Sequence, residues 1–362
     1  MKSKSICLVI HSLSLGGMER VMSVLANNFC ERENVVVNIV LIGKEPKIAF
    51  ALNEKISVYK PSFKFDASKR FKSTIKTIKF LRATVVKLSP DVVLSFGEYW
   101  NNLVLLSLFK LKYPVYIADR SQPNKNLGKL QNYLRDKLYP NAAGYIAQTE
   151  KAREIACQNK WNKNTIVIGN PIKSILHSRE VDQENMVLTV GRLIPTKHID
   201  QLIDIFRNVN NTAWKLVIIG GNAKKHTLLE DYRELVKQLG LNECIELIGA
   251  TQNVADYYRK AKIFAFTSSS EGFPNVIGEA MSYGIPVIAY DCVAGPSDLI
   301  EDGETGFLIA ERNQKAYEHK MSKLIHETAL RNRLGAKSLE KIKDFDADVI
   351  TDKFFNFINN IK

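Results

Sequence analysis

Short apolar runs alternate along this chain with longer segments in which apolar residues recur every three or four positions. The short runs predict buried strands, and the longer period predicts amphipathic helices. In the first half, strands are expected at 5–11, 35–42, 91–95, 115–118 and 144–147. Strands that alternate with helices in this way predict an α/β fold with a parallel sheet covered on both faces.

The alternation pauses at residues 168–171, Ile-Gly-Asn-Pro, and then begins again. Further strands are expected at 186–190, 214–219, 244–248, 261–267 and 286–290. Because 362 residues exceed what one hydrophobic core usually fills, we predict two domains, 1–170 and 171–345. Two such α/β domains leave a cleft at the carboxyl ends of their strands, the usual ligand position in these sheets.

The composition is that of an ordinary soluble globular protein, with 45% hydrophobic and 25% charged residues. No apolar run reaches the length that spans a membrane. The first fifteen residues resemble a signal peptide, but His11 and the pair Gly16-Gly17 favour a strand followed by a ligand-facing loop. The five cysteines show no paired spacing, which speaks against disulfides or a zinc site and favours a cytoplasmic, reducing compartment.

Charge is divided unevenly between the two halves. Residues 1–170 contain 27 Lys and Arg against 12 Asp and Glu, so the basic excess of the chain lies in the first domain. Such a domain attracts nucleic acid, anionic lipid or a phosphorylated substrate. Within it, 68–88 predicts a basic amphipathic helix with apolar residues from Phe71 to Leu88 at helical spacing. This helix either packs on the sheet with solvated lysines or lays its lysines on an anionic membrane.

The clearest candidate for a functional site is the segment 271–279, which lies between the expected strands 261–267 and 286–290. Its glycine-bearing loop leads into a helix that we expect to hold Pro274 in its first turn and to end at Gly284. A helix N-terminus offers unpaired N–H groups and partial positive charge, so this one can bind an anion such as a phosphate.

Two carboxylates frame this predicted anion site. Glu271 precedes the helix, and Glu279 lies one turn after Asn275 on the same helix face. Because a phosphate repels a carboxylate, we expect both to accept hydrogen bonds from neighbouring hydroxyl groups, such as those of a nucleotide sugar. The alternative is that Glu279 only compensates the helix dipole and that Glu271 is a solvated loop residue.

Two cations lie at the corresponding edge of the second sheet. Arg192 and Lys197 follow the expected strand 186–190, where a departing diphosphate needs either a metal or fixed cations. A metal usually brings an aspartate pair, but the acids at 344–348 are better explained as the N-terminal cap of an amphipathic helix at 349–361. We therefore predict that these two cations stabilise the diphosphate without a metal or cofactor. The alternative is that each is an ordinary surface charge.

The residues resemble glycosyltransferase family 4, whose retaining enzymes have the two-domain GT-B fold and include transferases of polysaccharide and lipid-linked oligosaccharide assembly. The E-x7-E element at 271–279 is the most distinctive signature of that family, and the resemblance spans essentially the whole chain. Other matching motifs are Gly16-Gly17-Met18-Glu19-Arg20, Gly191-Arg192-Leu193 followed by Lys197, Asn170-Pro171, and the segments 284–289, 295–303 and 306–308.

The resemblance implies a role for each charged position. Glu279 would bind the ribose hydroxyls, Glu271 would bind the hydroxyls of the donor sugar, and Arg192 and Lys197 would hold the diphosphate. The C-terminal segment, 346–362, would cross back and pack on the first domain.

The resemblance also implies further positions on the donor and acceptor sides. The donor side comprises backbone N–H groups near Phe273, Asn275 and Val276, the pair Ile248-Gly249 facing the base, and the pair Gly16-Gly17 opposite. On the acceptor side, many relatives have a histidine after the fifth strand of the first domain. This chain has Asp119 and Arg120 there, and we place both on the acceptor side.

These observations predict transfer of a hexose or N-acetylhexosamine from a nucleotide diphosphate sugar, with uridine as the expected base, to a saccharide acceptor. The basic first domain suits an acceptor linked to a polyprenyl diphosphate at the inner face of the cytoplasmic membrane. A nucleotide-sugar epimerase or hydrolase of the same architecture is an alternative. A nucleic-acid-binding protein is another, although no recognised binding module supports it, and Gly16-Gly17 lacks the G-x-G-x-x-G pattern of a dinucleotide site.

Overall fold

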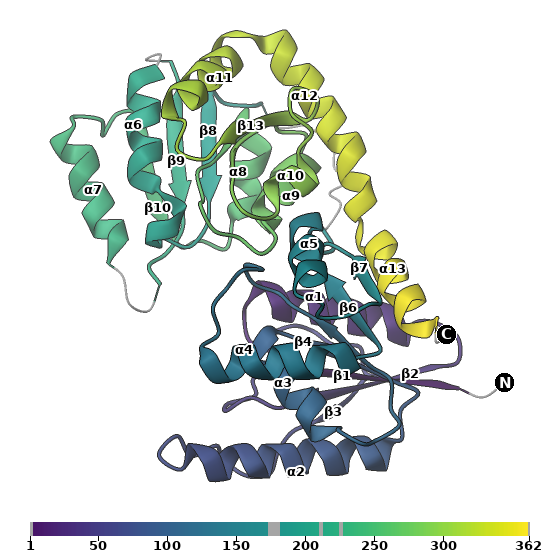
Figure 1. Ribbon diagram of the computed structural model, residues 1–362. Helices are drawn as coiled ribbons and strands as arrows, with labels where there is room; N and C mark the ends of the chain where they lie inside the picture. Colours follow the sequence, from purple (N-terminus) through teal and green to yellow (C-terminus); the bar gives the residue numbers. More distant parts are fainter. Residues whose placement is uncertain (1–2, 173–181, 210–212, 224–226, 361–362) are drawn as a thin grey trace. The chain divides into compact units, whose positions relative to one another are not determined.

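The computed structural model describes residues 3–172, 182–209, 213–223 and 227–360, which form two compact units (Figure 1). The first unit contains the chain up to Pro171 and the C-terminal segment from Ala347, and the second is the intervening chain. Each unit contains a parallel sheet with helices on both faces. The predicted α/β class with two Rossmann-like domains is therefore confirmed.

The sheet of the first unit has seven parallel strands in the order β3-β2-β1-β4-β5-β6-β7. They are β1 (Lys4–Ile10), β2 (Val35–Leu41), β3 (Ser57–Tyr59), β4 (Val92–Phe96), β5 (Val115–Ala118), β6 (Gly144–Ala147) and β7 (Thr165–Val167). Every residue of β4 is buried, as expected for a parallel strand that helices cover on both sides. The two edge strands, β3 and β7, were not predicted, because three residues are too few to show a period.

Helices cover both faces of this first sheet. They are α1 (Gly17–Cys30), α2 (Arg70–Leu88), α3 (Glu98–Ser107), α4 (Lys129–Leu138), the 3-10 turn η1 (Tyr139–Asn141), α5 (Glu150–Gln158) and α13 (Ala347–Asn359). The C-terminal helix α13 packs beside α1 on one face, where the rings of Phe29 and Phe355 are 5.5 Å apart. On the other face, α2 packs beside α3 and α3 beside α4. The C-terminal helix thus returns to the first unit, as the family resemblance implied.

The basic helix α2 forms as predicted, but its buried face differs from the expected one. Leu81 and Val85 are fully buried in the core. Steps of four residues back from them place Thr77 and Ser73 on the same face, and both are buried. Phe71 is therefore left outside the core and is 81% exposed.

The second unit contains a six-stranded parallel sheet in the order β10-β9-β8-β11-β12-β13. Its strands are β8 (Met186–Val190), β9 (Lys215–Ile219), β10 (Ile245–Gly249), β11 (Ile263–Phe266), β12 (Val287–Asp291) and β13 (Gly306–Ala310). Its helices and 3-10 turns are η2 (Pro195–Lys197), α6 (Ile199–Val209), α7 (Leu228–Gln238), α8 (Val254–Lys260), α9 (Asn275–Ser282), α10 (Pro296–Leu299), α11 (Gln314–His326), α12 (Thr328–Lys341) and η3 (Ile342–Phe345). One apolar cluster joins α6 and α11 to the sheet, and another joins α9 to the opposite face.

Replacement of Phe354 in α13 tests whether the C-terminal helix stabilises the first unit. Its side chain is fully buried, and its ring centroid lies 6.0 Å from that of Phe96. Because Phe354→Ala leaves a cavity, we expect it to lower the free energy of unfolding by about 3–5 kcal/mol, measured by urea denaturation. The exposed Phe71→Ala is the matched control and should change it by less than about 0.5 kcal/mol. Equal effects of the two variants would contradict the packing of α13.

Candidate functional site

The candidate site lies at the carboxyl edge of the second sheet, where strand order reverses. From β8 the chain adds β9 and β10 on one side, and it then returns to place β11 on the other side of β8. The loops that follow β8 and β11 therefore begin on neighbouring strands. Ligands of open α/β sheets bind at such a reversal point.

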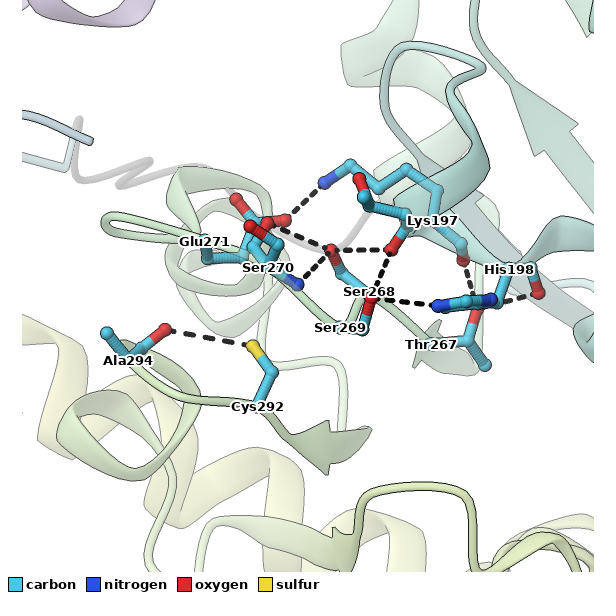
Figure 2. Close-up of polar contacts among 10 residues, drawn as sticks. Lys197, His198, Thr267, Ser268, Ser269, Ser270, Glu271, Cys292 and Ala294 are labelled. Atoms are coloured by element: carbon cyan, nitrogen blue, oxygen red, sulfur yellow. Dashed lines mark hydrogen bonds and ion pairs between the residues drawn. The ribbon is translucent and has the colours of Figure 1, made fainter. Parts of the chain in front are cut away.

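Hydroxyl groups of the loop after β11 bind it to the turn η2 after β8 (Figure 2). Thr267 donates its hydroxyl hydrogen bond to the carbonyl of Lys197 at 2.8 Å. The carbonyl of Thr196 accepts the Ser268 hydroxyl at 3.2 Å and the Ser269 amide at 2.9 Å. Because the acceptors are main-chain carbonyls, the two loops hold each other in a fixed register.

Lys197 and Glu271, two of the predicted catalytic residues, form an ion pair across these loops (Figure 2). Both side chains are largely buried, with 17% and 16% of their surface exposed. The Lys197 ammonium also lies 5.1 Å from the centroid of the Phe266 ring, the last residue of β11. The structure thus brings together a cation and a carboxylate that are 74 residues apart in the sequence.

Arg192 lies in the loop between β8 and η2, and its side chain is exposed. The loop itself is anchored, since Gly191 donates its N–H to the carbonyl of Ile219 and Leu193 to that of Gly221. Within the described residues, no ion pair or hydrogen bond of the Arg192 side chain occurs. Its guanidinium is therefore available to a ligand at this edge of the sheet.

The helix that was predicted to bind an anion begins one residue later than expected. Pro274 is the N-cap of α9, with φ −83° and ψ 80°, and Asn275 is the first helical residue. The Asn275 amide donates to the carbonyl of Phe273 at 3.0 Å, so this N–H is already engaged. The expected place of Pro274 is therefore corrected, and the Asn275 amide is not an unpaired group. Val276 follows in the first turn, and its carbonyl accepts the Tyr258 hydroxyl at 3.4 Å.

A neighbouring glycine holds Pro274 in place. Gly295 has φ +106°, and a β-carbon added to it would lie 2.2 Å from Cδ of Pro274. This position needs glycine both for its backbone conformation and for the close approach of the proline ring. The start of α9 thus packs directly on the turn before α10.

Glu279 lies on α9, four residues after Asn275, as predicted. Its Oε2 accepts a hydrogen bond from the Tyr258 hydroxyl at 3.2 Å, and the Tyr258 ring stacks on that of Tyr283. Ile248 and Gly249 end strand β10, two strands away from β8 along the same sheet edge. The predicted donor residues of the second unit therefore lie at the carboxyl end of β10, in the loop after β11 or in α9.

The predicted residues of the first unit lie at the carboxyl ends of its strands too. Gly16 and Gly17 are exposed and form the N-cap and first residue of α1 after β1. A β-carbon on Gly16 would lie 2.3 Å from Oε2 of Glu19, which folds back over it. This close approach explains the glycine at the start of the helix.

Asp119 is buried inside the first unit, where its carboxylate accepts three side-chain hydrogen bonds. The donors are the hydroxyl of Tyr139 at 2.7 Å, the amide of Asn101 at 2.9 Å and the hydroxyl of Tyr145 at 3.3 Å. Burial, and to a smaller extent the nearby Glu98 carboxylate, raises the pKa of the Asp119 carboxyl to about 7. Through these hydrogen bonds, the buried carboxyl group links the end of β5 to α3, η1 and β6. Only 7% of Asp119 is exposed, so an acceptor can reach little of it.

The Arg120 side chain contacts Asn170 and Phe96 within the first unit. Its Nη1 donates to Oδ1 of Asn170 at 2.9 Å, and its guanidinium lies 4.0 Å from the centroid of the Phe96 ring. Burial lowers the pKa of Arg120 to about 9, against the attraction of the Glu98 carboxylate. Its Nε and Nη2 have no hydrogen-bond partner among the described residues. Of the two acceptor-side candidates, Arg120 is therefore the one with N–H groups that make no hydrogen bond within the described residues.

Sequence reasoning missed three polar residues that support the site: His198, Ser269 and Tyr258. His198 Nε2 lies 2.8 Å from the Ser269 hydroxyl, and Tyr258 donates to Glu279. A sequence signal did exist in the run of hydroxyl residues 267–270, directly after a buried strand. No group of three or more His, Cys, Asp or Glu side chains suited to a metal occurs in the described part of the chain.

Comparison with known proteins addresses the class of enzyme. Residues 174–341 match the family model described as Glycosyl transferases group 1. The chain is 27% identical to the amylovoran biosynthesis glycosyltransferase AmsD of Erwinia amylovora, with 95% of this chain and 96% of that protein covered. It is 25% identical, with 99% of each chain covered, to an α-1,4-N-acetyl-D-galactosaminyltransferase of Campylobacter jejuni whose name specifies a saccharide on diphospho-undecaprenol.

Solved structures share the fold of this chain. The apo form of the lipopolysaccharide outer core galactosyltransferase WaaB has a TM-score of 0.81 and 20% identity, with 98% of this chain and 99% of that chain covered. TarM has a TM-score of 0.79 and 17% identity, with 99% of each chain covered. Together the comparisons confirm the predicted fold and the predicted class of enzyme, a glycosyltransferase.

Replacement of Gly295 tests whether its contact with Pro274 shapes the start of α9. We expect Gly295→Ala to lower the melting temperature of the second unit and to weaken binding of inorganic pyrophosphate, measured by calorimetry, because the added methyl group displaces Pro274. Gly303→Ala is the matched control, since Gly303 also has a positive φ, +76°, but nothing lies within 4 Å of the added atom. Pyrophosphate binding that is equal in the two variants would contradict the role of this contact.

Proposed function

We propose that this protein transfers a hexose or N-acetylhexosamine from a uridine diphosphate sugar to a hydroxyl group of a saccharide, with retention of configuration. The main support for the proposal is the ion pair between Lys197 and Glu271. It lies where the strand order of the second sheet reverses, beside the start of α9. A cation and a carboxylate side by side suit a ligand with a diphosphate next to a sugar. The phosphates bind the cation, and the sugar hydroxyls donate to the carboxylate.

Negative charge develops on the diphosphate as the sugar leaves, and fixed positive charge at that point lowers the barrier. In this proposal the charge is stabilised by Lys197, the exposed Arg192 and the N-terminus of α9, without a metal ion. Glu271 orients the donor sugar through its hydroxyls, and Glu279 binds the ribose. Activity that is unchanged by EDTA would support the absence of a metal, and activity that requires an added divalent ion would contradict it.

The proposed reaction occurs on one face of the donor sugar. The bond between the anomeric carbon and the diphosphate oxygen breaks, and the acceptor oxygen bonds to that carbon from the same side. The departing phosphate oxygen takes the proton of the acceptor hydroxyl, so no side chain is needed as a covalent nucleophile. The choice of uridine is supported by a structural neighbour, HepE of Anabaena, whose structures are described as complexes with UDP and with UDP-glucose.

For the acceptor, we propose a saccharide linked to a polyprenyl diphosphate in cell-surface polysaccharide assembly. Two Campylobacter jejuni relatives carry names that specify diphospho-undecaprenol saccharides, and the Erwinia relative is named for amylovoran biosynthesis. In the first unit, the unused donors of Arg120 are the candidate contacts to such an acceptor. A nucleotide-sugar epimerase or hydrolase remains the competing assignment, and it would form its product without any acceptor.

Substitutions at the two loops test the donor site. We expect Glu271→Ala and Arg192→Ala each to reduce the rate of sugar transfer about 100-fold, because each removes a group that stabilises the donor in the transition state. A thermal-shift screen of UDP-glucose, UDP-galactose, UDP-N-acetylglucosamine and UDP-N-acetylgalactosamine identifies the donor for the assay. The exposed Arg312→Ala is the control for loss of a surface cation in the same unit. Full activity in either site variant would reject the assignment.

The surface of the first unit supports the proposal that the protein binds peripherally to an anionic membrane. On α2, Phe71 is 81% exposed and Ile75 37%, and Lys72, Lys76 and Lys79 are exposed beside them. An amphipathic helix with exposed apolar residues and lysines suits the interface of an anionic bilayer. In the residues that the structure covers, no helix has the length and apolar character needed to cross a membrane.

Charge reversal on α2 tests this placement. We expect Lys72→Glu, Lys76→Glu and Lys79→Glu together to lower binding to phosphatidylglycerol vesicles about 100-fold in a flotation assay, because each cation contributes about 1 kcal/mol near an anionic surface. The matched control reverses three exposed lysines of the second unit, Lys215, Lys237 and Lys315. Equal losses in both triple variants, or no dependence on lipid charge, would reject the proposal.

A further inference from the structure

A hydrogen bond between two side chains joins the segments that carry Lys197 and Glu271, next to the hydroxyl–carbonyl bonds of Thr267 and Ser268. His198 Nε2 lies 2.8 Å from Oγ of Ser269 (Figure 2). His198 directly follows Lys197, and Ser269 lies two residues before Glu271. The bond therefore lies directly beside the ion pair and spans the same two loops.

The backbone of His198 is in a conformation that favours glycine. Its φ of 49° and ψ of 48° are left-handed, and they end the turn η2. The N–H of His198 donates to Pro195, and its carbonyl accepts the amide of Leu202 at the start of α6. Glycine adopts this conformation without strain and keeps both main-chain bonds. The turn itself therefore does not require the imidazole.

The hydroxyl of Ser269 connects the imidazole to the main chain of η2. Its Oγ lies 3.4 Å from the carbonyl oxygen of Thr196, to which the Ser269 amide also donates. When the hydroxyl donates to that carbonyl, its oxygen accepts the Nε2–H of His198. Both the protonated ring and its Nε2–H neutral tautomer carry this hydrogen.

In the absence of a donor, both the ion pair and the imidazole–hydroxyl bond join the two loops; when a donor binds, only the second remains. In the proposed function, the diphosphate draws the Lys197 ammonium away and the sugar hydroxyls engage Glu271, so the two side chains no longer pair with each other. The bond between His198 and Ser269 involves neither group. It therefore continues to hold the two loops together in the donor complex.

We propose that His198 and Ser269 are positioning residues, which keep Lys197 and Glu271 at the spacing that bond breakage requires while the donor is bound. This inference rests on the proposed function, and it assigns neither residue a contact with the donor. Small displacements of groups that act in the transition state reduce the rate of the chemical step more than they reduce ground-state binding. The effect is therefore expected in kcat.

His198→Gly separates positioning from folding, because glycine suits the left-handed turn. We expect this variant to melt at the wild-type temperature or above it, while kcat for sugar transfer falls about tenfold or more and the donor KM changes less than about twofold. Ser269→Ala should lower kcat by a similar factor, and the double variant should be no slower than either single variant. Ser269→Thr keeps the hydroxyl and should restore most of the rate.

Controls come from the same unit and have matched chemistry. Arg312→Gly replaces another left-handed residue, with φ +66°, at an exposed position, and Ser322→Ala removes a hydroxyl that lies 3.4 Å from His326 on α11. Neither control should alter kcat. Wild-type kcat in His198→Gly, or effects of the two single variants that multiply in the double variant, would overturn the inference.

The assay also separates this inference from the proposed function. Transfer and release of UDP are measured with UDP-glucose, UDP-galactose, UDP-N-acetylglucosamine and UDP-N-acetylgalactosamine. A wild-type protein that binds and turns over none of the four contradicts the proposed function itself. Wild-type turnover together with an unaffected His198→Gly variant overturns only the positioning role.

Discussion

The pairing of β8 with β11 is the constraint from which the candidate site follows. These strands are neighbours only because the chain reverses its direction of strand addition after β10. Their carboxyl ends therefore place the loop of Lys197 beside the loop of Glu271. Parallel pairing fixes this arrangement through main-chain hydrogen bonds and buried apolar side chains, so the charged residues do not have to hold the loops together by themselves.

Small residues make the close approach of these loops possible. Hydroxyl groups at Thr267 and Ser268 reach main-chain carbonyls of the other loop, which a longer side chain at either place would push away. Under the first loop, a β-carbon on Gly220 would lie 1.8 Å from the carbonyl oxygen of Gly191. Glycine is therefore required at Gly220 by contact distance, although its own φ is not positive.

The charged residues of the two units differ in how far water and ligands can reach them. Asp119 is buried and Arg120 is half-buried, and loss of water contact raises the pKa of Asp119 to about 7 and lowers that of Arg120 to about 9. Lys197 and Glu271 keep part of their surface exposed and pair with each other. Removing one partner from a buried charge network is costly, whereas an ion pair that keeps part of its surface exposed can exchange partners with an arriving ligand. This difference favours Lys197 and Glu271 for ligand binding and Asp119 for holding the fold.

The sequence by itself determined the class of fold and most of the central strands, because apolar runs and helical periods depend on local residue order. It also indicated Lys197 and Glu271, because each follows a predicted strand and a resemblance covered both. It did not determine the short edge strands β3 and β7, since three residues show no period. It also did not determine the buried face of α2, because the burial of Leu81 and Val85 in the core leaves Phe71 facing solvent.

Contacts between distant segments were decided only by the tertiary structure. The enclosure of Asp119 depends on Tyr139 and Tyr145, which reach it from other strands and turns. The bond between His198 and Ser269 joins residues 71 positions apart, and neither residue shows its partner in the sequence around it. Local patterns determine which element forms, but partners of this kind are set by how the sheet brings its strand ends together.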